Sequence, residues 1–164
     1  MSRRIAMVAA LAVCTGFFSS GVASADESNR LAVELVPVYN MTVFDEPDYG
    51  LEGVWHTSNA STSLFDVVVT NTGYELDDDL SVFVSTTLEV VDYEGSDWDC
   101  WDVEGGVQCL NQDTTVHGEA WPTLRIVSHL ISDEQDPWDT LDVYADSSVG
   151  DAHAGVPLWG PASH

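Results

Sequence analysis

The stretch from Leu64 to Gly73, LFDVVVTNTG, decides the fold class of this chain. Phe65, Val67 and Val69 are apolar at every second position, which puts their side chains on one face of an extended strand. The strand is expected to end at Asn71-Thr72-Gly73, because asparagine and glycine accept the backbone conformations of tight turns. The pattern therefore predicts a half-buried β-strand followed by a turn.

The same period of two recurs on both sides of this stretch, and no window of the chain has a sustained helical period. Short extended segments separated by Gly, Asn, Asp and Pro are typical of two sheets packed face to face. We therefore predict an all-β fold, an immunoglobulin-like antiparallel β-sandwich of about seven strands, with a short strand expected at 54–56. The apolar positions that share a face in the other segments are Leu31, Val33 and Leu35; Leu80, Val82 and Val84; Leu124, Ile126 and Leu130; and Leu141, Val143 and Ala145.

The N-terminal segment has the three parts of an export signal. Arg3 and Arg4 supply the positive charge, residues 5–13 are apolar, and Ala23-Ser24-Ala25 matches the small-residue pattern that signal peptidase cleaves. We expect cleavage at this site and secretion of the chain into the extracellular space, with no membrane attachment afterwards. Lipoprotein and twin-arginine signals are alternatives, which the residues before Cys14 and after the arginines match less well.

The rest of the chain has the length of a single domain. Besides the signal peptide at residues 1–25, we expect residues 26–30 to be frayed and residues 31–151 to form the sandwich. The segment 152–164 is interrupted by glycines and prolines, which predicts a flexible C-terminal tail. We expect the protein to be a monomer.

The expected secreted part is strongly acidic. Its 28 acidic residues are balanced only by Arg30 and Arg125, a formal charge of −26, and it contains no lysine. Nucleic acids and anionic membranes are therefore disfavoured as partners, because like charges repel and no counterions would be released. Three interpretations of the acidity remain, namely adaptation to a salty environment, which we favour, calcium binding, and a cationic partner.

Calcium binding has one specific candidate site. Asp77, Asp78 and Asp79 follow one another between two expected strands, and carboxylate oxygens from loops are ligands that Ca²⁺ prefers. No EF-hand spacing accompanies them, and turn residues that face water explain the same triplet. Calcium is thus the only cofactor that the sequence suggests, and solvated turn residues are the favoured explanation.

Two cysteines remain after the expected cleavage, and an oxidising compartment favours a disulfide between them. If residues 104–105 form a two-residue hairpin turn, Cys100 and Cys109 lie opposite each other at a non-hydrogen-bonded pair, with Cα atoms about 4.5 Å apart. The same register places Trp101 opposite Gln108. The cysteine spacing lacks the CxxC pattern of metal and redox sites, so we predict one structural hairpin disulfide.

Several of these segments together resemble a known family. Residues 67–73 are similar to the V-T-N-T-G signature of the bacterial and archaeal conserved repeat domain of unknown function number eleven. Residues 98–109 resemble its W-x-C…G-G-x-V-x-C hairpin, and residues 118–127 resemble its G-x-x-x-T-L-x-V segment. The resemblance covers about residues 31–153, in a single copy. It implies an immunoglobulin-like extracellular domain of a kind often stacked in surface proteins, with no established catalytic role.

Catalysis finds little support in the sequence. The 5 histidines are scattered, and no HExxH or G-x-S-x-G setting is present. We therefore predict a secreted, non-enzymatic module for cell-surface or extracellular protein interaction. The alternative is a carbohydrate- or small-ligand-binding domain that uses exposed tryptophans, for which Trp98 and Trp101 beside the disulfide are the best candidates. A secreted enzyme on the same scaffold is a third possibility.

Overall fold

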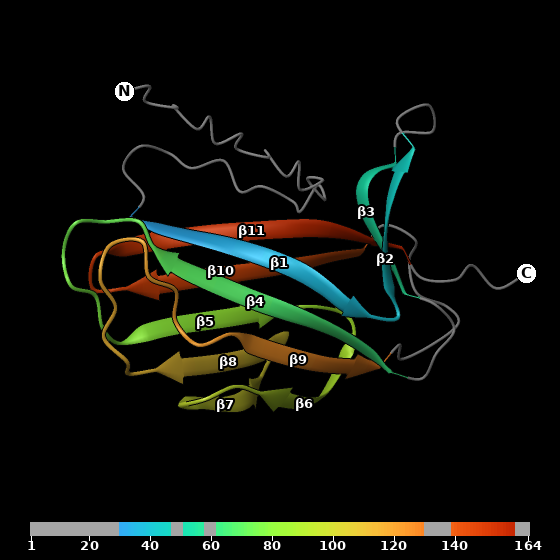
Figure 1. Ribbon diagram of the computed structural model, residues 1–164. Coiled ribbons are helices and arrows are strands. Elements are labelled where there is room, and N and C mark those ends of the chain that lie inside the picture. The colour runs from blue at the N-terminus through green and yellow to red at the C-terminus, as the bar shows by residue number, and fades with distance from the viewer. Residues whose placement is uncertain (1–29, 47–50, 58–61, 130–138, 160–164) are drawn as a thin grey trace, which may run out of the picture.

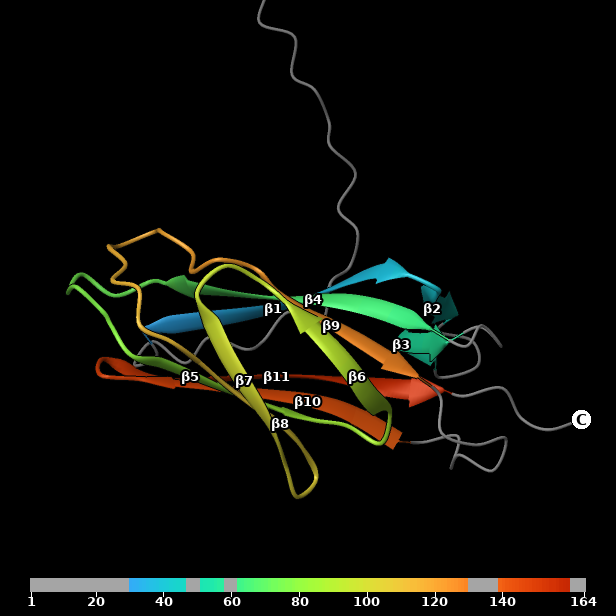
Figure 2. The same ribbon diagram turned by 90° about the horizontal axis from the view of Figure 1, so that it is seen from below.

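The computed structural model describes residues 30–46, 51–57, 62–129 and 139–159 of the 164-residue chain. In these residues every regular element is a β-strand, and the strands form two sheets that pack face to face (Figure 1, Figure 2). The chain is thus an all-β, immunoglobulin-like sandwich, as the alternation of apolar residues predicts. The strands are β1 (Leu31–Tyr39), β2 (Met41–Glu46), β3 (Leu51–Thr57), β4 (Ser63–Asn71), β5 (Leu80–Ser85), β6 (Glu89–Glu94), β7 (Trp98–Val103), β8 (Gly106–Asn111), β9 (Leu124–His129), β10 (Asp139–Ser147) and β11 (Gly150–Trp159).

The smaller sheet has the strand order β1-β4-β9-β6, and the larger sheet has the order β2-β3-β11-β10-β5-β8-β7. Neighbouring strands of the described residues run antiparallel, except β3 and β11, which run parallel. The described residues form 11 strands where the sequence predicts about seven. β2, β6 and β7 lie at sheet edges, where a strand need not bury one whole face, so the sequence alternation there is weak. The short strand expected at 54–56 is part of β3.

The core lies between the sheets and is filled by alternate residues of both. In β4, Phe65, Val67 and Val69 are at most 1% exposed, as their period of two predicts. Phe65 also meets the buried ring of Trp55 edge to face, with centroids 6.2 Å apart. The edge strand β1 and the central strands β5, β8, β9 and β10 contribute Leu31, Val33, Leu35, Leu80, Val82, Val84, Val107, Leu124, Ile126, Leu141, Val143 and Ala145.

Strand β11 corrects the prediction that residues 152–164 form a flexible tail. It lies inside the larger sheet, between β3 and β10. Gly155 and Pro157, which suggest a loop in the sequence, lie between the buried positions. They obscure the alternation of buried and outward residues that would have indicated a strand. Residues 160–164 lie outside the described residues. The buried positions of β11 are Ala152, Ala154, Val156 and Leu158.

Some expectations fall on residues that the structure does not describe. The expected signal peptide at residues 1–25 and all but Arg30 of the expected frayed segment 26–30 lie outside the described residues, as does Leu130. Among the described residues, no helix has the length and apolar character needed to cross a membrane.

The β7–β8 hairpin has the register that the cysteine spacing predicts. Cys100 lies opposite Cys109 with Cα atoms 4.1 Å apart, and the two residues form a disulfide. Trp101 lies opposite Gln108, also as predicted. In Figure 2 the tip of this hairpin projects beyond the larger sheet, on the side away from the smaller sheet.

Candidate binding surface

The outer face of the larger sheet carries a row of side chains that runs across five of its strands. Side chains alternate along a strand, so residues beside the buried positions point away from the core. The pairing register places one such residue of each strand directly next to that of its neighbour. From the sheet edge inward, the row consists of Trp101, Gln108, Phe83, Tyr144 and His153. We name these residues the aromatic row.

Three rings of the aromatic row, those of Phe83, Tyr144 and His153, stack on one another. The centroids of Phe83 and Tyr144 are 6.3 Å apart with an interplanar angle of 21°. Those of Tyr144 and His153 are 4.5 Å apart with an angle of 25°. Trp101 is 42% exposed and Tyr144 is 48% exposed, so a partner can reach both rings.

Gln108 fills the position between Trp101 and Phe83. Its Nε2 donates hydrogen bonds to the Ser81 hydroxyl at 2.9 Å and to the Val82 carbonyl oxygen at 3.1 Å. These bonds anchor the Gln108 side chain to β5, the strand that carries Phe83. The row is therefore continuous from the disulfide-bonded hairpin to the middle of the sheet.

Carboxylates flank the aromatic row along the strands. Asp99, Asp146 and Asp151 each lie two residues from a member of the row, so they point to the same side of the sheet. Asp142 lies on the other side of the row, with its Oδ1 atom 2.8 Å from Nε2 of His153. Asp146 and Asp151 lie directly opposite each other in the register of β10 and β11. The five strands that carry the row contain no lysine and no arginine.

Sequence reasoning identified only Trp101 in this row, and its role in recognition stays a prediction. Phe83 and Tyr144 each lie between buried positions of a strand in which apolar residues alternate. The sequence could therefore have predicted that both rings point outward. His153 falls in the segment that was expected to be a tail. Only the strand order reveals that these residues are neighbours.

Trp98, the second tryptophan candidate, packs into the molecule. It shares the inner side of β7 with the buried Cys100 and contacts the core. Its indole N–H donates a hydrogen bond to the carbonyl oxygen of Pro122 at 2.7 Å. Its ring and its N–H group therefore both have partners within the protein, so Trp98 has a role in packing, and its role in recognition stays a prediction.

One end of the sandwich is formed by two long connections, residues 72–79 between β4 and β5 and residues 112–123 between β8 and β9 (Figure 1, left). We name these residues the loop end. Backbone hydrogen bonds join the two connections, from Asp77 N–H to the Thr115 oxygen at 3.1 Å and from Thr115 N–H to the Asp77 oxygen at 2.8 Å. The loop end is thus tied together through its backbone.

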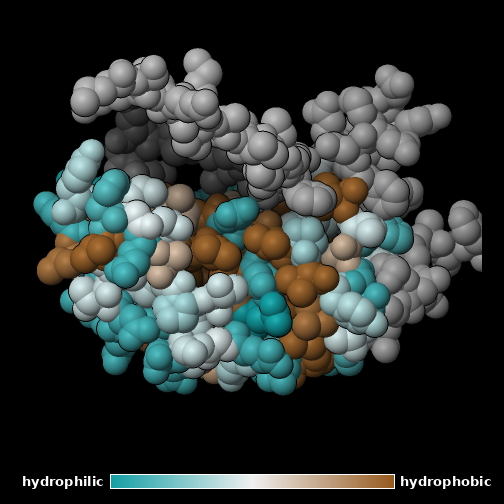
Figure 3. Space-filling model, viewed as in Figure 1, coloured by the Kyte–Doolittle hydropathy of each residue, from teal (hydrophilic) through white to brown (hydrophobic). Residues whose placement is uncertain are grey.

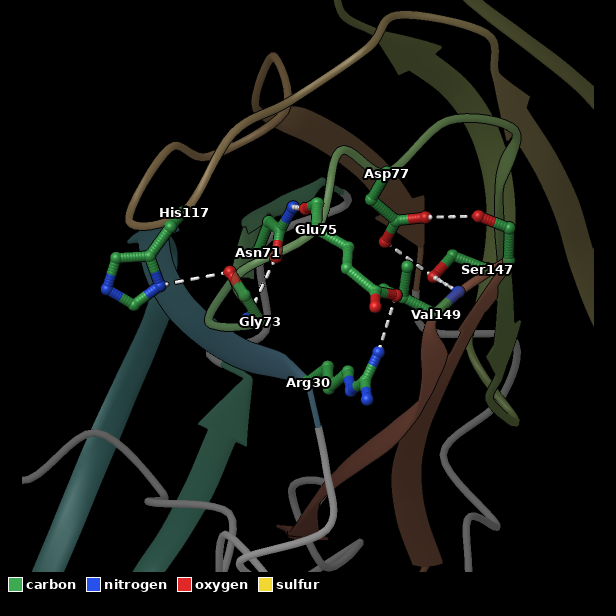
Figure 4. Close-up of polar contacts among 9 residues, drawn as sticks. Arg30, Asn71, Gly73, Glu75, Asp77, His117, Ser147 and Val149 are labelled. Atoms are coloured by element: carbon green, nitrogen blue, oxygen red, sulfur yellow. Dashed lines mark hydrogen bonds and ion pairs between the residues drawn. The ribbon is translucent and has the colours of Figure 1, made fainter.

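The three aspartates that suggested calcium lie in the loop end. The carboxylate of Asp77 is buried and accepts hydrogen bonds from the hydroxyls of Ser147 at 2.6 Å and Ser148 at 3.0 Å (Figure 4). Asp78 and Asp79 are exposed. In the part of the chain that the structure describes, no group of three or more His, Cys, Asp or Glu side chains is placed to hold a metal ion. The one buried carboxylate of the triplet thus already bonds the β10–β11 turn, and a calcium site at these aspartates stays a prediction.

Asn71, the asparagine of the V-T-N-T-G segment, also organises the loop end. Its side chain is fully buried, and its Oδ1 atom accepts a hydrogen bond from Gly73 N–H at 2.9 Å. Its Nδ2 atom donates to the carbonyl oxygens of Glu75 at 3.0 Å and Thr115 at 3.3 Å (Figure 4). Asn71 thus holds the chain after β4 against the chain after β8, which is a structural role.

The loop end exposes a second pair of rings. Tyr74 is 92% exposed and stacks on His117, with centroids 4.8 Å apart. The Nδ1 atom of His117 lies 3.1 and 3.0 Å from the carbonyl oxygens of residues 72 and 73, so this nitrogen is the donor. Leu76 and Val116 are exposed nearby, and Figure 3 shows apolar atoms at this end of the molecule.

Both arginines of the described residues are paired away from the aromatic row. On the smaller sheet, Arg125 donates two hydrogen bonds to Asp66, at 2.7 and 3.0 Å. The hydrogen bond to this carboxylate raises the pKa of Arg125 above its usual value. Arg30 pairs with Glu75 of the loop end at 2.6 Å. The carboxylates beside the row therefore receive no cation from either arginine.

No family model and no curated protein matches this chain. Among solved structures, it is similar to the DNA-binding domain of Cep-1 from C. elegans, with a TM-score of 0.52, 9% identity, and coverage of 82% of this chain and 91% of that one. It is also similar to the seventh ScaB type I cohesin from Pseudobacteroides cellulosolvens, with a TM-score of 0.47, 9% identity, and coverage of 66% and 88%. At this identity, the likeness to Cep-1 shows a shared fold alone.

Proposed function

We propose that this chain is a secreted, non-enzymatic binding module whose aromatic row contacts an extracellular protein. The observation that supports this proposal is the register of the row, which holds the exposed Trp101 of β7 and Tyr144 of β10 on one sheet face, joined through Gln108 and Phe83 of the two strands between them. Aromatic side chains are enriched at the centres of protein interfaces, where a few of them supply most of the binding energy. Tyr144 is also held by stacking on Phe83 and His153, and a ring that is already held in place loses little conformational entropy on binding.

Two features support secretion. Residues 1–25 have the charge and hydropathy pattern of an export signal. The Cys100–Cys109 disulfide is of a kind that persists in oxidising compartments outside the cytosol. Mass spectrometry of the protein from the culture medium of the expressing cells should find Asp26 as the first residue. Recovery of the protein only inside cells, with residues 1–25 attached, would contradict this part of the proposal.

A second candidate function is glycan binding, and the same row favours it. Pyranose rings have apolar faces of C–H groups that stack on aromatic rings, and the flanking carboxylates accept hydrogen bonds from sugar hydroxyls. The distinction between protein and glycan partners rests on the charge of the surface.

The experiment that tests the binding face uses amide chemical shifts recorded by NMR. The protein is titrated separately with a lysine-rich peptide, with a neutral β-1,4-linked glucose hexamer and with an N-acetylglucosamine hexamer. We expect at least one probe to shift the amides of the aromatic row, and the double variant Trp101→Ala/Tyr144→Ala to remove the response. The matched control is Tyr74→Ala, which removes a 92% exposed ring outside the row and should leave the response intact. The proposal fails if no probe shifts the row, or if Tyr74→Ala abolishes binding equally.

A further inference from the structure

We infer that the partner of the aromatic row is basic, and that a lysine- or arginine-rich segment of an extracellular protein lies across the row. This inference rests on the proposed binding function and names the chemistry of its partner. Three observations carry it, and each concerns a different group of atoms.

The first observation is a pair of like charges in direct register. Asp146 of β10 lies opposite Asp151 of β11, and both side chains are exposed. Like charges that face each other across antiparallel strands destabilise the sheet. A cationic side chain placed between the two carboxylates would turn this repulsion into attraction. The five strands that carry the row supply no such cation themselves, because they contain no lysine or arginine.

The second observation is that the described arginines are engaged elsewhere. Arg125 is bound by Asp66 on the smaller sheet, and Arg30 is bound by Glu75 in the loop end. The only cationic group that the row itself can offer is the imidazole of His153, which already contacts Asp142. The negative charge of this face is therefore available for neutralisation by solvent ions or by a partner.

The third observation is that the carboxylates stand beside open ring faces. Trp101 and Tyr144 are 42% and 48% exposed, and Asp99, Asp142 and Asp146 lie two residues from them along β7 and β10. Lysine and arginine interact favourably with the faces of tryptophan and tyrosine rings, and they pair with carboxylates as well. A neutral glycan would use the rings but would leave the repulsion between the carboxylates in place.

The test measures the affinity of a lysine-rich peptide of eight residues by isothermal titration calorimetry, at an ionic strength near 0.15 M. The Trp101→Ala/Tyr144→Ala variant should bind at least fivefold more weakly, because two cation–π contacts are removed. The Asp146→Asn/Asp151→Asn variant should also bind at least fivefold more weakly. An uncharged Gly/Ser peptide of the same length should not bind.

A matched charge control separates this surface from the general acidity of the protein. Asp78→Asn/Asp79→Asn removes the same two charges from exposed positions of the loop end, and Asp79, with φ 55°, has a backbone conformation that asparagine accepts. This variant should lose less than twofold in affinity for the lysine-rich peptide. Equal losses in the two Asp→Asn variants would overturn the inference, because binding would then depend on net charge alone.

The glucose and N-acetylglucosamine hexamers complete the test. If a neutral hexamer binds to the row and the lysine-rich peptide does not, the basic partner is wrong while the binding function stands. If neither kind of probe perturbs the row, the binding function fails together with the inference.

Discussion

The loop end and the aromatic row both expose stacked rings, but their polar groups are arranged in opposite ways. At the loop end, the side chains of Asp77 and of Asn71, the last residue of β4, are buried and bonded to groups of the same chain. Beside the aromatic row, Asp146 and Asp151 are exposed and face each other as like charges. The first arrangement stabilises the fold, whereas the second costs stability and is compatible with a role in binding.

This difference gives a criterion that separates structural residues from candidate binding residues. A polar or aromatic side chain whose partners lie within the chain, such as Trp98, has its interactions satisfied by folding. An exposed ring beside carboxylates, such as Trp101, keeps a free face that folding does not cover. Substitutions of the buried, hydrogen-bonded residues at the loop end should therefore change stability, and substitutions of the exposed rings in the row should change binding.

The largest expected contrast is between two tryptophans. Trp121 of the loop end is 2% exposed, and its indole N–H donates to the Asp113 carbonyl oxygen at 2.9 Å. Trp121→Ala should lower the free energy of unfolding by about 3–5 kcal/mol, since it leaves a cavity in the core. Trp101→Ala should change it by less than about 0.5 kcal/mol. Urea unfolding of both variants measures this contrast, and a large loss in Trp101→Ala would remove the distinction between the regions.

Loss of the Asn71 amide should be next in size. Asn71→Ala removes three hydrogen bonds to the backbone of the loop end. At about 1 kcal/mol for each bond, the variant should be destabilised by about 3 kcal/mol. The control is Gln112→Ala, an exposed amide of the same end, for which urea unfolding should show almost no change. Similar stability of the two variants would contradict the structural role of Asn71.

The disulfide is expected to contribute slightly less, and it connects stability with the row. Replacement of Cys100 and Cys109 by alanine opens a loop of about ten residues, which corresponds to about 2.7 kcal/mol on the chain-entropy model. Thermal unfolding should show this loss. Because Trp101 follows Cys100 in β7, the NMR response of the row to its ligand should also weaken. Unchanged unfolding in the double variant would argue against the disulfide in solution.

Asp77 and its neighbours test the calcium interpretation. Asp77→Ala removes the acceptor of two serine hydroxyls and should cost about 2 kcal/mol, since hydrogen bonds to charged groups are worth about 1.5–3 kcal/mol. Asp78→Asn, at an exposed position, should have little effect on the unfolding midpoint. Added CaCl₂ at constant ionic strength should not shift the midpoint of the parent protein. A clear calcium shift that Asp78→Asn removes would restore the metal site.

The smallest expected effect concerns His56 of β3. Burial lowers the pKa of this imidazole below its ordinary value, so the folded state holds its proton less firmly than the unfolded state. Neutral His56 therefore contributes to the free energy of unfolding. This contribution is complete above the unfolded pKa of about 6.5 and is lost as the pH falls through the lower folded pKa. Denaturant unfolding from pH 8 to pH 5 measures it. In His56→Gln the decline should be smaller, and an unchanged slope would exclude His56 as its source.

Local signals in the sequence were sufficient for much of the fold. The period of two at Phe65, Val67 and Val69 identifies a strand because one face of each sheet is buried. The hairpin arithmetic identifies the partner of Cys100 because strand pairing next to a tight turn is determined by the turn. The resemblance to the conserved repeat family and the expected signal peptide stay predictions. Strand β11 was missed, because a glycine and a proline at its outward positions look like a loop.

By itself, the sequence determined the fold class, the disulfide and the acidity, since each depends on composition or on residues close together in the chain. Only the tertiary structure decided which outward residues meet. Phe83, Trp101, Tyr144 and His153 lie in one row with Gln108 because the strand order β11-β10-β5-β8-β7 brings five strands into register. No local pattern contains that order, because it arises from how the two sheets bury their apolar faces against each other.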